Sequence, residues 1–118
     1  MKEKAIENQI LSWLAMHRIL AFKHESQGTF DARIGVYRRK NSVHRKLGVA
    51  DILGCIGGRF LAIEVKSQTG RLSDHQKQFL LEVLAHGGIA FMARSIEDVE
   101  ENLTKAGVWP RLRSSSQI

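Results

Sequence analysis

Apolar residues recur along the chain at two spacings, one typical of helices and one typical of strands. Residues 3 to about 17 show the helical spacing, which predicts an amphipathic helix with one apolar face. The residues that form this face are Ile6, Ile10, Trp13 and Leu14. Two strand-like runs follow, residues 19–24 and residues 29–37, with a turn between them.

The centre of the chain is typical of a β-hairpin. Two strand-like runs, residues 49–53 and residues 60–66, flank Gly57-Gly58, a pair that suits the positive φ angles of a tight turn. Side chains alternate between the two faces of a strand. One face of the second strand therefore carries Leu61, Ile63 and Val65, and the other carries Phe60, Ala62, Glu64 and Lys66.

The C-terminal half predicts a helix, a strand and a second helix. Ser73 is a good N-cap and Gln76 stands three residues later, a capping-box pattern that predicts a helix to about His86. Residues 89–93 are continuously apolar and predict a buried strand, and Ser95 caps a last helix.

The length of 118 residues suits one domain over residues 1–110, and residues 111–118 contain little that would order them as more than a flexible tail. No apolar run approaches the length of a membrane span, and the N-terminus lacks the continuous apolar run of a signal peptide. The single cysteine, Cys55, has no partner within the chain, which fits a reducing compartment. We therefore expect a cytoplasmic location, in a bacterium or in the host of a virus.

Three charged residues interrupt the apolar pattern of the hairpin. Glu64 and Lys66 point the same way from a strand otherwise fit for burial, and Asp51 lies on the partner strand. Buried charges are costly unless they are paired or bind a metal ion. Two neighbouring carboxylates suit Mg²⁺, and an adjacent ammonium group can stabilise charge on a phosphate.

These three residues therefore have the parts of a metal-dependent site that cleaves phosphodiesters. In the alternative interpretation, Glu64 and Lys66 belong to a solvated strand face and Asp51 is a strand-end residue.

Glu7 falls on the apolar side of the first predicted helix, between the angular positions of Leu11 and Leu14. Two interpretations stay open. Glu7 is either a first-turn glutamate favoured by the helix dipole, or a third carboxylate turned inward toward Asp51 and Glu64.

The chain is basic, with a net charge of +6 and an isoelectric point of about 9.9, which favours a polyanionic partner. Residues 38–46 contain five basic residues and no acidic one. Such a run is usually a solvated loop, but its place just before the acidic centre favours contact with a phosphate backbone. We expect DNA contacts from Arg38, Arg39, Lys40, Arg45 and Lys46.

Four segments of the sequence resemble the VRR-NUC domains of the PD-(D/E)XK nuclease superfamily. They are GVADILG at 48–54, RFLAIEVK at 59–66, GRLSDHQKQFL at 70–80 and GGIAFMARS at 87–95. Ala50 stands where the superfamily's name has a proline.

The resemblance implies an α/β fold with an αβββαβ core, in which helices flank a mixed sheet. It also implies a set of site residues. The metal ligands are Glu7, Asp51, Glu64 and the backbone carbonyl of Val65, and the catalytic residues are Asp51, Glu64, Lys66 and Gln76.

We therefore expect a Mg²⁺-dependent DNA endonuclease that also accepts Mn²⁺. Small members of the family look like homodimeric enzymes that act on branched DNA, so the expected substrate is a four-way junction. The alternatives are a restriction-type or nicking endonuclease, and a non-catalytic module that binds DNA through its basic face.

Overall fold

The structure of the protein, a computed structural model, describes residues 1–25, 29–31, 35–38 and 44–110. Its helices are α1 (Glu3–Met16), α2 (Asp74–Ala85) and α3 (Ile96–Lys105). Its strands are β1 (Leu20–Lys23), β2 (Thr29–Asp31), β3 (Val36–Arg38), β4 (Ile52–Ile56), β5 (Arg59–Val65) and β6 (Ile89–Ala93). No helix among these residues is long and apolar enough to cross a lipid bilayer. The predictions for Arg39, Lys40 and residues 111–118 lie outside the described residues.

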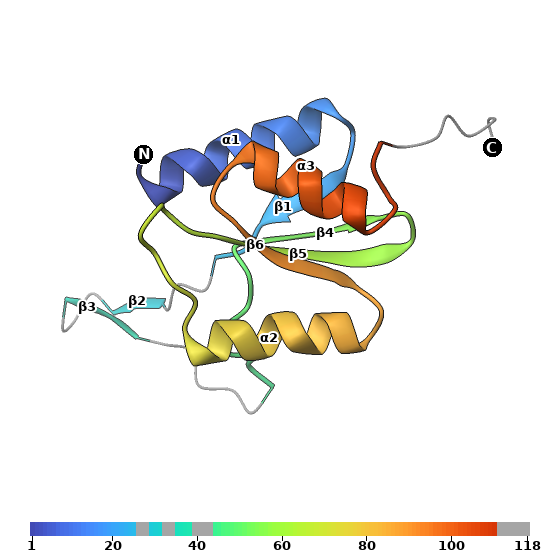
Figure 1. Cartoon of the computed structure of the whole chain (residues 1–118). Coiled ribbons are helices and arrows are strands. Elements are labelled where there is room, and N and C mark those ends of the chain that lie inside the picture. The colour runs from blue at the N-terminus through green and yellow to red at the C-terminus, as the bar shows by residue number, and fades with distance from the viewer. Residues whose placement is uncertain (26–28, 32–34, 39–43, 111–118) are drawn as a thin grey trace.

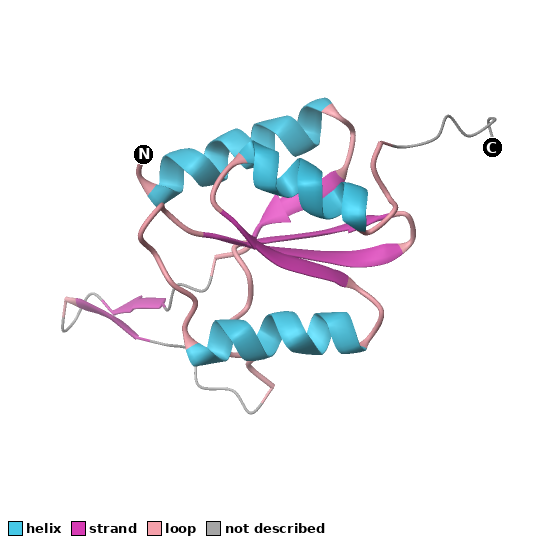
Figure 2. Cartoon of the chain, in the orientation of Figure 1, coloured by secondary structure: helices cyan, strands magenta, loops and turns pink. Residues whose placement is uncertain are grey.

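A four-stranded mixed sheet in the order β1-β4-β5-β6 forms the middle layer of the fold. β1, β4 and β5 are antiparallel neighbours, whereas β6 runs parallel to β5. Helices α1 and α3 lie on one face of the sheet and α2 lies on the other (Figures 1 and 2). This arrangement is the α/β fold that the resemblance implies, with α3 added after the αβββαβ core.

The alternation predicted for β5 determines which layer each residue packs against. Leu61, Ile63 and Val65 are buried in the core beneath α1 and α3, which also contains Ile10, Leu14, Val99 and Leu103. Ala62 faces the other way and packs with residues of α2, namely Phe79, Leu80 and Val83. Glu64 follows Ala62 on this second face.

The predicted hairpin is confirmed, but its first strand begins later than expected. Gly57 and Gly58 have φ angles of 59° and 75°, as a two-residue turn requires. β4 covers Ile52–Ile56, not residues 49–53, because the pairing with β5 extends to the turn, where Ile56 faces Arg59. Asp51 therefore precedes the strand.

Residues 29–37 do not form the single strand that the sequence predicts. They contribute to β2 and β3, which form a separate antiparallel sheet in which Thr29 pairs with Arg38. The chain reverses before Val36 at Gly35, whose φ angle of 67° favours glycine.

Arg59 connects the ends of two helices that lie on opposite faces of the sheet. Its guanidinium group donates hydrogen bonds to the carbonyl oxygens of Gly87 at 2.8 Å, Gly88 at 3.2 Å and Ala106 at 3.3 Å. The last carbonyl groups of a helix have no partner within the helix, so one arginine satisfies acceptors beyond both α2 and α3.

An aromatic cluster joins the end of α1 to the segment after α3. The ring centroids are 4.5 Å apart for Trp13 and His17, 5.1 Å for Trp13 and Trp109, and 4.7 Å for His17 and Trp109. Trp13 and Trp109 also pack against the core beneath α1 and α3.

Candidate active site

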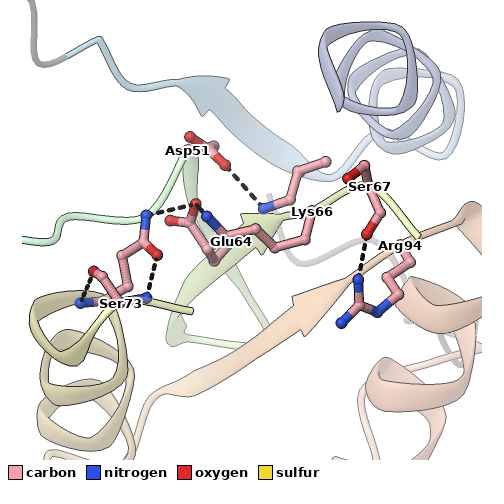
Figure 3. Close-up of polar contacts among 8 residues, drawn as sticks. Asp51, Glu64, Lys66, Ser67, Ser73 and Arg94 are labelled. Carbon is pink, nitrogen blue, oxygen red and sulfur yellow. Dashed lines mark hydrogen bonds and ion pairs between the residues drawn. The ribbon is translucent and has the colours of Figure 1, made fainter. Parts of the chain in front are cut away.

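Asp51 and Glu64 face each other at the open end of the β4–β5 hairpin. Ile52 pairs with Ile63, and continuing this register places Asp51 opposite Glu64, with both side chains on one face. The backbone N–H of Val65 donates a hydrogen bond to Asp51 Oδ2 at 2.9 Å (Figure 3). This bond connects the carboxylate of Asp51 to the strand that carries Glu64.

Glu64 is a buried carboxylate with only one hydrogen-bonded oxygen. Its residue exposure is 2%, and its Oε2 accepts a hydrogen bond from Gln76 Nε2 at 3.3 Å. Lys66 Nζ lies 3.9 Å from the same oxygen. Glu64 Oε1 is buried and has no hydrogen-bond partner among the described residues. An orphaned buried oxygen of this kind is a potential metal ligand.

Burial, followed by the contact with the Asp51 side chain and the charge of Asp51, raises the pKa of Glu64 from 4.5 to about 9, and the charge of Lys66 acts against this rise. In the absence of a cation, the Asp51 and Glu64 pair therefore retains a proton near neutral pH. A divalent cation would relieve the repulsion that favours this proton.

Lys66 comes directly after β5 and its side chain is only 13% exposed. Its backbone N–H donates to the carbonyl oxygen of Ala93 at 3.0 Å, which fixes the start of the side chain. The following loop folds back onto it, because a Cβ placed at Gly70 would lie 3.3 Å from Lys66 Cδ. The ammonium group is thereby directed toward Glu64.

Gln76 has two contacts that the sequence presented as alternatives. Its Oε1 accepts the backbone N–H of Ser73 at 2.8 Å, while Ser73 Oγ accepts the backbone N–H of Gln76, which completes the predicted capping box. Its Nε2 still donates to Glu64. One side chain therefore caps α2 and orients a carboxylate of the site.

Glu7 lies on the buried face of α1 with an exposure of 7%, as its angular position on the predicted helix indicates, and its role as a metal ligand stays a prediction. Lys23 Nζ lies 3.5 Å from Glu7 Oε1, a contact that the sequence did not predict. Burial raises the pKa of Glu7, Lys23 lowers it, and the charge of Asp51 raises it, so Glu7 interacts electrostatically with Asp51. No three His, Cys, Asp or Glu side chains of the described residues converge into a ready metal cluster.

Arg45 and Lys46 border a depression of about 300 Å³ that Asp51 and Gln76 also line. Lys46 forms an ion pair with Glu82 of α2. These two members of the predicted basic segment thus line the same depression as Asp51, while the side chain of Arg38 lies outside the described part of the structure.

Gly48 positions the segment that contains Arg45 and Lys46, just before Asp51. Gly48 was not predicted from the sequence as a site residue. Its φ angle is 71°, and a Cβ at this position would lie 2.2 Å from the carbonyl oxygen of His75. Only glycine allows the chain before Asp51 to approach the start of α2 so closely. A glycine three residues before Asp51 was the only signal in the sequence.

The oxygen atoms that the site offers as metal ligands fit Mg²⁺. This ion takes oxygen ligands and is often held by one or two carboxylates together with water. Asp51 and Glu64 supply carboxylates, and the carbonyl group of Val65 adjoins Glu64 in the chain.

The model of the VRR-NUC domain family matches residues 2–97, which contain all the site residues described above. Among solved structures, one described as a VRR_NUC domain protein superposes with a TM-score of 0.61 over 99% of this chain and 97% of its own, at 18% sequence identity. At this identity the likeness concerns the fold. No curated protein matches the chain.

Proposed function

Since the chain belongs to the VRR-NUC domain family, whose members share the nuclease fold of the PD-(D/E)XK superfamily, we propose that it is a Mg²⁺-dependent DNA endonuclease. The observation that carries the proposal is the Asp51 and Glu64 pair with the ammonium group of Lys66 3.9 Å from Glu64 Oε2. A module that only binds DNA has no need for paired acids that face a polyanion.

Each residue of the site has a role in this proposal. Asp51, Glu64 and the carbonyl group of Val65 would hold Mg²⁺, or Mn²⁺ in its place, and the inward Glu7 would add negative charge. When bound, such an ion polarises the scissile phosphate and lowers the pKa of the attacking water. Lys66 would stabilise the charge that develops on the phosphate, and Gln76 would keep Glu64 in its orientation.

The proposed substrate is branched DNA, in particular a four-way junction, cut by a homodimer. The support is the basic charge of the chain and its small size. One chain offers one such site, and two symmetric cuts need two sites, which a two-fold dimer supplies.

A cleavage assay tests the proposal. Labelled linear duplex, flap and four-way junction are incubated with the protein in Mg²⁺, in Mn²⁺ or in EDTA, with Asp51→Asn as the control for contaminating nucleases. We expect cuts in both metals, none in EDTA or with Asp51→Asn, and preference for the junction. Binding without cleavage in any metal would contradict the nuclease proposal.

Sedimentation velocity at micromolar concentration tests the dimer separately. A monomer that cuts linear duplex and junction equally well would overturn the junction proposal and favour a restriction-type or nicking enzyme. It would leave the metal-dependent nuclease intact.

A further inference from the structure

A second group of cations borders the candidate active site, beside the loop that follows Lys66. Arg71, Lys77 and Arg94 line an open depression of about 650 Å³, which we call the Arg94 groove. The other residues that line it, which include Gly70 and Met92, are uncharged. Among the described residues, every charged side chain that lines the groove is therefore positive.

The groove lies one strand away from the acidic pair. Met92 of β6 is the parallel partner of Glu64 of β5, and neighbouring strands are about 4.8 Å apart. Gly70, which lines the groove, also packs against the side chain of Lys66. Arg45 and Lys46 border the acidic pair from the β4 side, so the two groups of cations lie on opposite sides of β5.

The three cations of the groove have no carboxylate partner among the residues that the structure describes. Other basic residues of the same chain do have one: Lys23 pairs with Glu7, Lys46 with Glu82 and Lys105 with Glu101. Uncompensated cations around one depression create a local positive potential, which favours a bound anion.

Arg94 is held in place by its neighbours. Its backbone N–H donates to Asp98 Oδ2 at 2.8 Å, and its Nη1 donates to the carbonyl oxygen of Ser67 (Figure 3). Because the acceptor of the side chain is a neutral carbonyl, the positive charge is not cancelled. The other N–H groups of the guanidinium remain able to donate to a phosphate.

We propose that the Arg94 groove binds a phosphate of the nucleic-acid strand adjacent to the phosphate that is cut. The inference rests on the proposed nuclease function. A strand that crosses β5 would meet cations on both sides of Asp51 and Glu64, so its backbone is held both before and after the cleaved bond. Contacts on both sides of the cleaved bond require a strand that continues through the site. An endonuclease, which cuts within a strand, has this geometry.

The salt dependence of binding tests the groove without any need for cleavage. Binding of a dye-labelled four-way junction is measured in EDTA between low and moderate salt for Arg71→Gln, Lys77→Gln and the double variant. Loss of one phosphate contact reduces the slope of log K against log salt by about one, so the double variant, which loses the single phosphate of the groove, should lose about one. Lys105→Gln removes the same charge from α3 and should leave the slope unchanged.

Failure of the groove proposal can be distinguished from failure of the proposed nuclease function. If the double variant has the same slope as the unmodified protein and still cleaves DNA, the Arg94 groove does not bind a phosphate. The nuclease proposal would be unaffected. A reduced slope in a protein that cuts no DNA would support the groove and remove the proposed function. An equal loss of slope in Lys105→Gln would show a general charge effect and would also overturn the groove.

A neutral phosphate analogue locates the contact. Once the cut is mapped, a methylphosphonate placed at each neighbouring linkage should weaken binding by the unmodified protein at one position and have little effect there on Arg71→Gln/Lys77→Gln. Equal weakening of both proteins at every position would overturn the assignment.

Discussion

Gln76 connects the first turn of α2 to Glu64, because its Nε2 donates to Glu64 Oε2 at 3.3 Å while its Oε1 accepts the backbone N–H of Ser73. The same side chain therefore contributes to the stability of a helix and to the orientation of a buried carboxylate. Two substitutions separate these contributions.

Gln76→Ala removes both contacts, whereas Ser73→Ala removes only a cap and leaves the amide beside Glu64. We expect Gln76→Ala to lower cleavage about 10- to 100-fold, as is typical for a residue that orients a metal ligand. Ser73→Ala should cost about 1 kcal/mol of stability and leave cleavage near normal well below its Tm. Equal losses of cleavage in the two variants would show that Gln76 acts through the cap alone.

Asp51→Asn, Glu64→Gln and Lys66→Met test the proposed chemistry, since each removes an ionisable group of the site and keeps the size of the side chain. We expect each to reduce cleavage by about 10²-fold or more. Circular dichroism and junction binding should remain close to those of the unmodified protein. A variant that cuts at a near-normal rate would exclude its residue from the mechanism.

The raised pKa of Glu64 predicts how the stability of the metal-free protein depends on pH. The folded state holds a proton on Glu64 up to a pKa of about 9, whereas the ordinary value is 4.5. The contribution of this group to stability is therefore complete below about pH 4.5 and is lost as the pH rises toward 9.

Glu64→Gln replaces the carboxyl group with an amide, which stays neutral over the whole pH range. The Tm of the variant minus that of the unmodified protein, measured in EDTA, should therefore increase between pH 5 and pH 9. Each unit of pKa shift corresponds to about 1.4 kcal/mol. Addition of Mg²⁺ should raise the Tm of the unmodified protein most at high pH. A Tm difference that is constant with pH would contradict the buried, proton-holding pair.

Gly48→Ala tests the close approach of the segment before Asp51 to α2. The new Cβ would lie 2.2 Å from the carbonyl oxygen of His75, so the segment must shift and both stability and cleavage should fall. Gly58→Ala is the matched control, because Gly58 has a similar φ angle of 75° and nothing within 4 Å. Its cost should be about 1–2 kcal/mol from the left-handed backbone alone, with normal cleavage. A smaller effect at Gly48 than at Gly58 would show that the contact is not important.

Local signals explain why much of the fold could be predicted. The alternation along β5, the Gly57-Gly58 turn and the Ser73 cap each depend on residues close in sequence. These signals also place Glu64 and Gln76 correctly. The start of β4 depends on pairing with its partner strands, and the division of residues 29–37 into β2 and β3 depends on a reversal of the chain.

The surroundings of the site could not be predicted, because they join segments distant in sequence. Lys23 reaches Glu7 from β1, and Gly48 packs against His75 at the start of α2. The Arg94 groove combines a loop, a helix and a strand. No periodicity in the sequence indicates which of these elements approach one another.

The aromatic cluster determines what can be measured without a label. Both tryptophans of the chain, Trp13 and Trp109, belong to it, and they pack against the core beneath α1 and α3. Glu64 and Gln76 lie on the opposite face of the sheet, beside α2. Intrinsic fluorescence should therefore follow the unfolding of the layer formed by α1 and α3, and should not change when DNA binds at the proposed active site beside α2. A change in emission on mixing with DNA would report a rearrangement transmitted through the sheet.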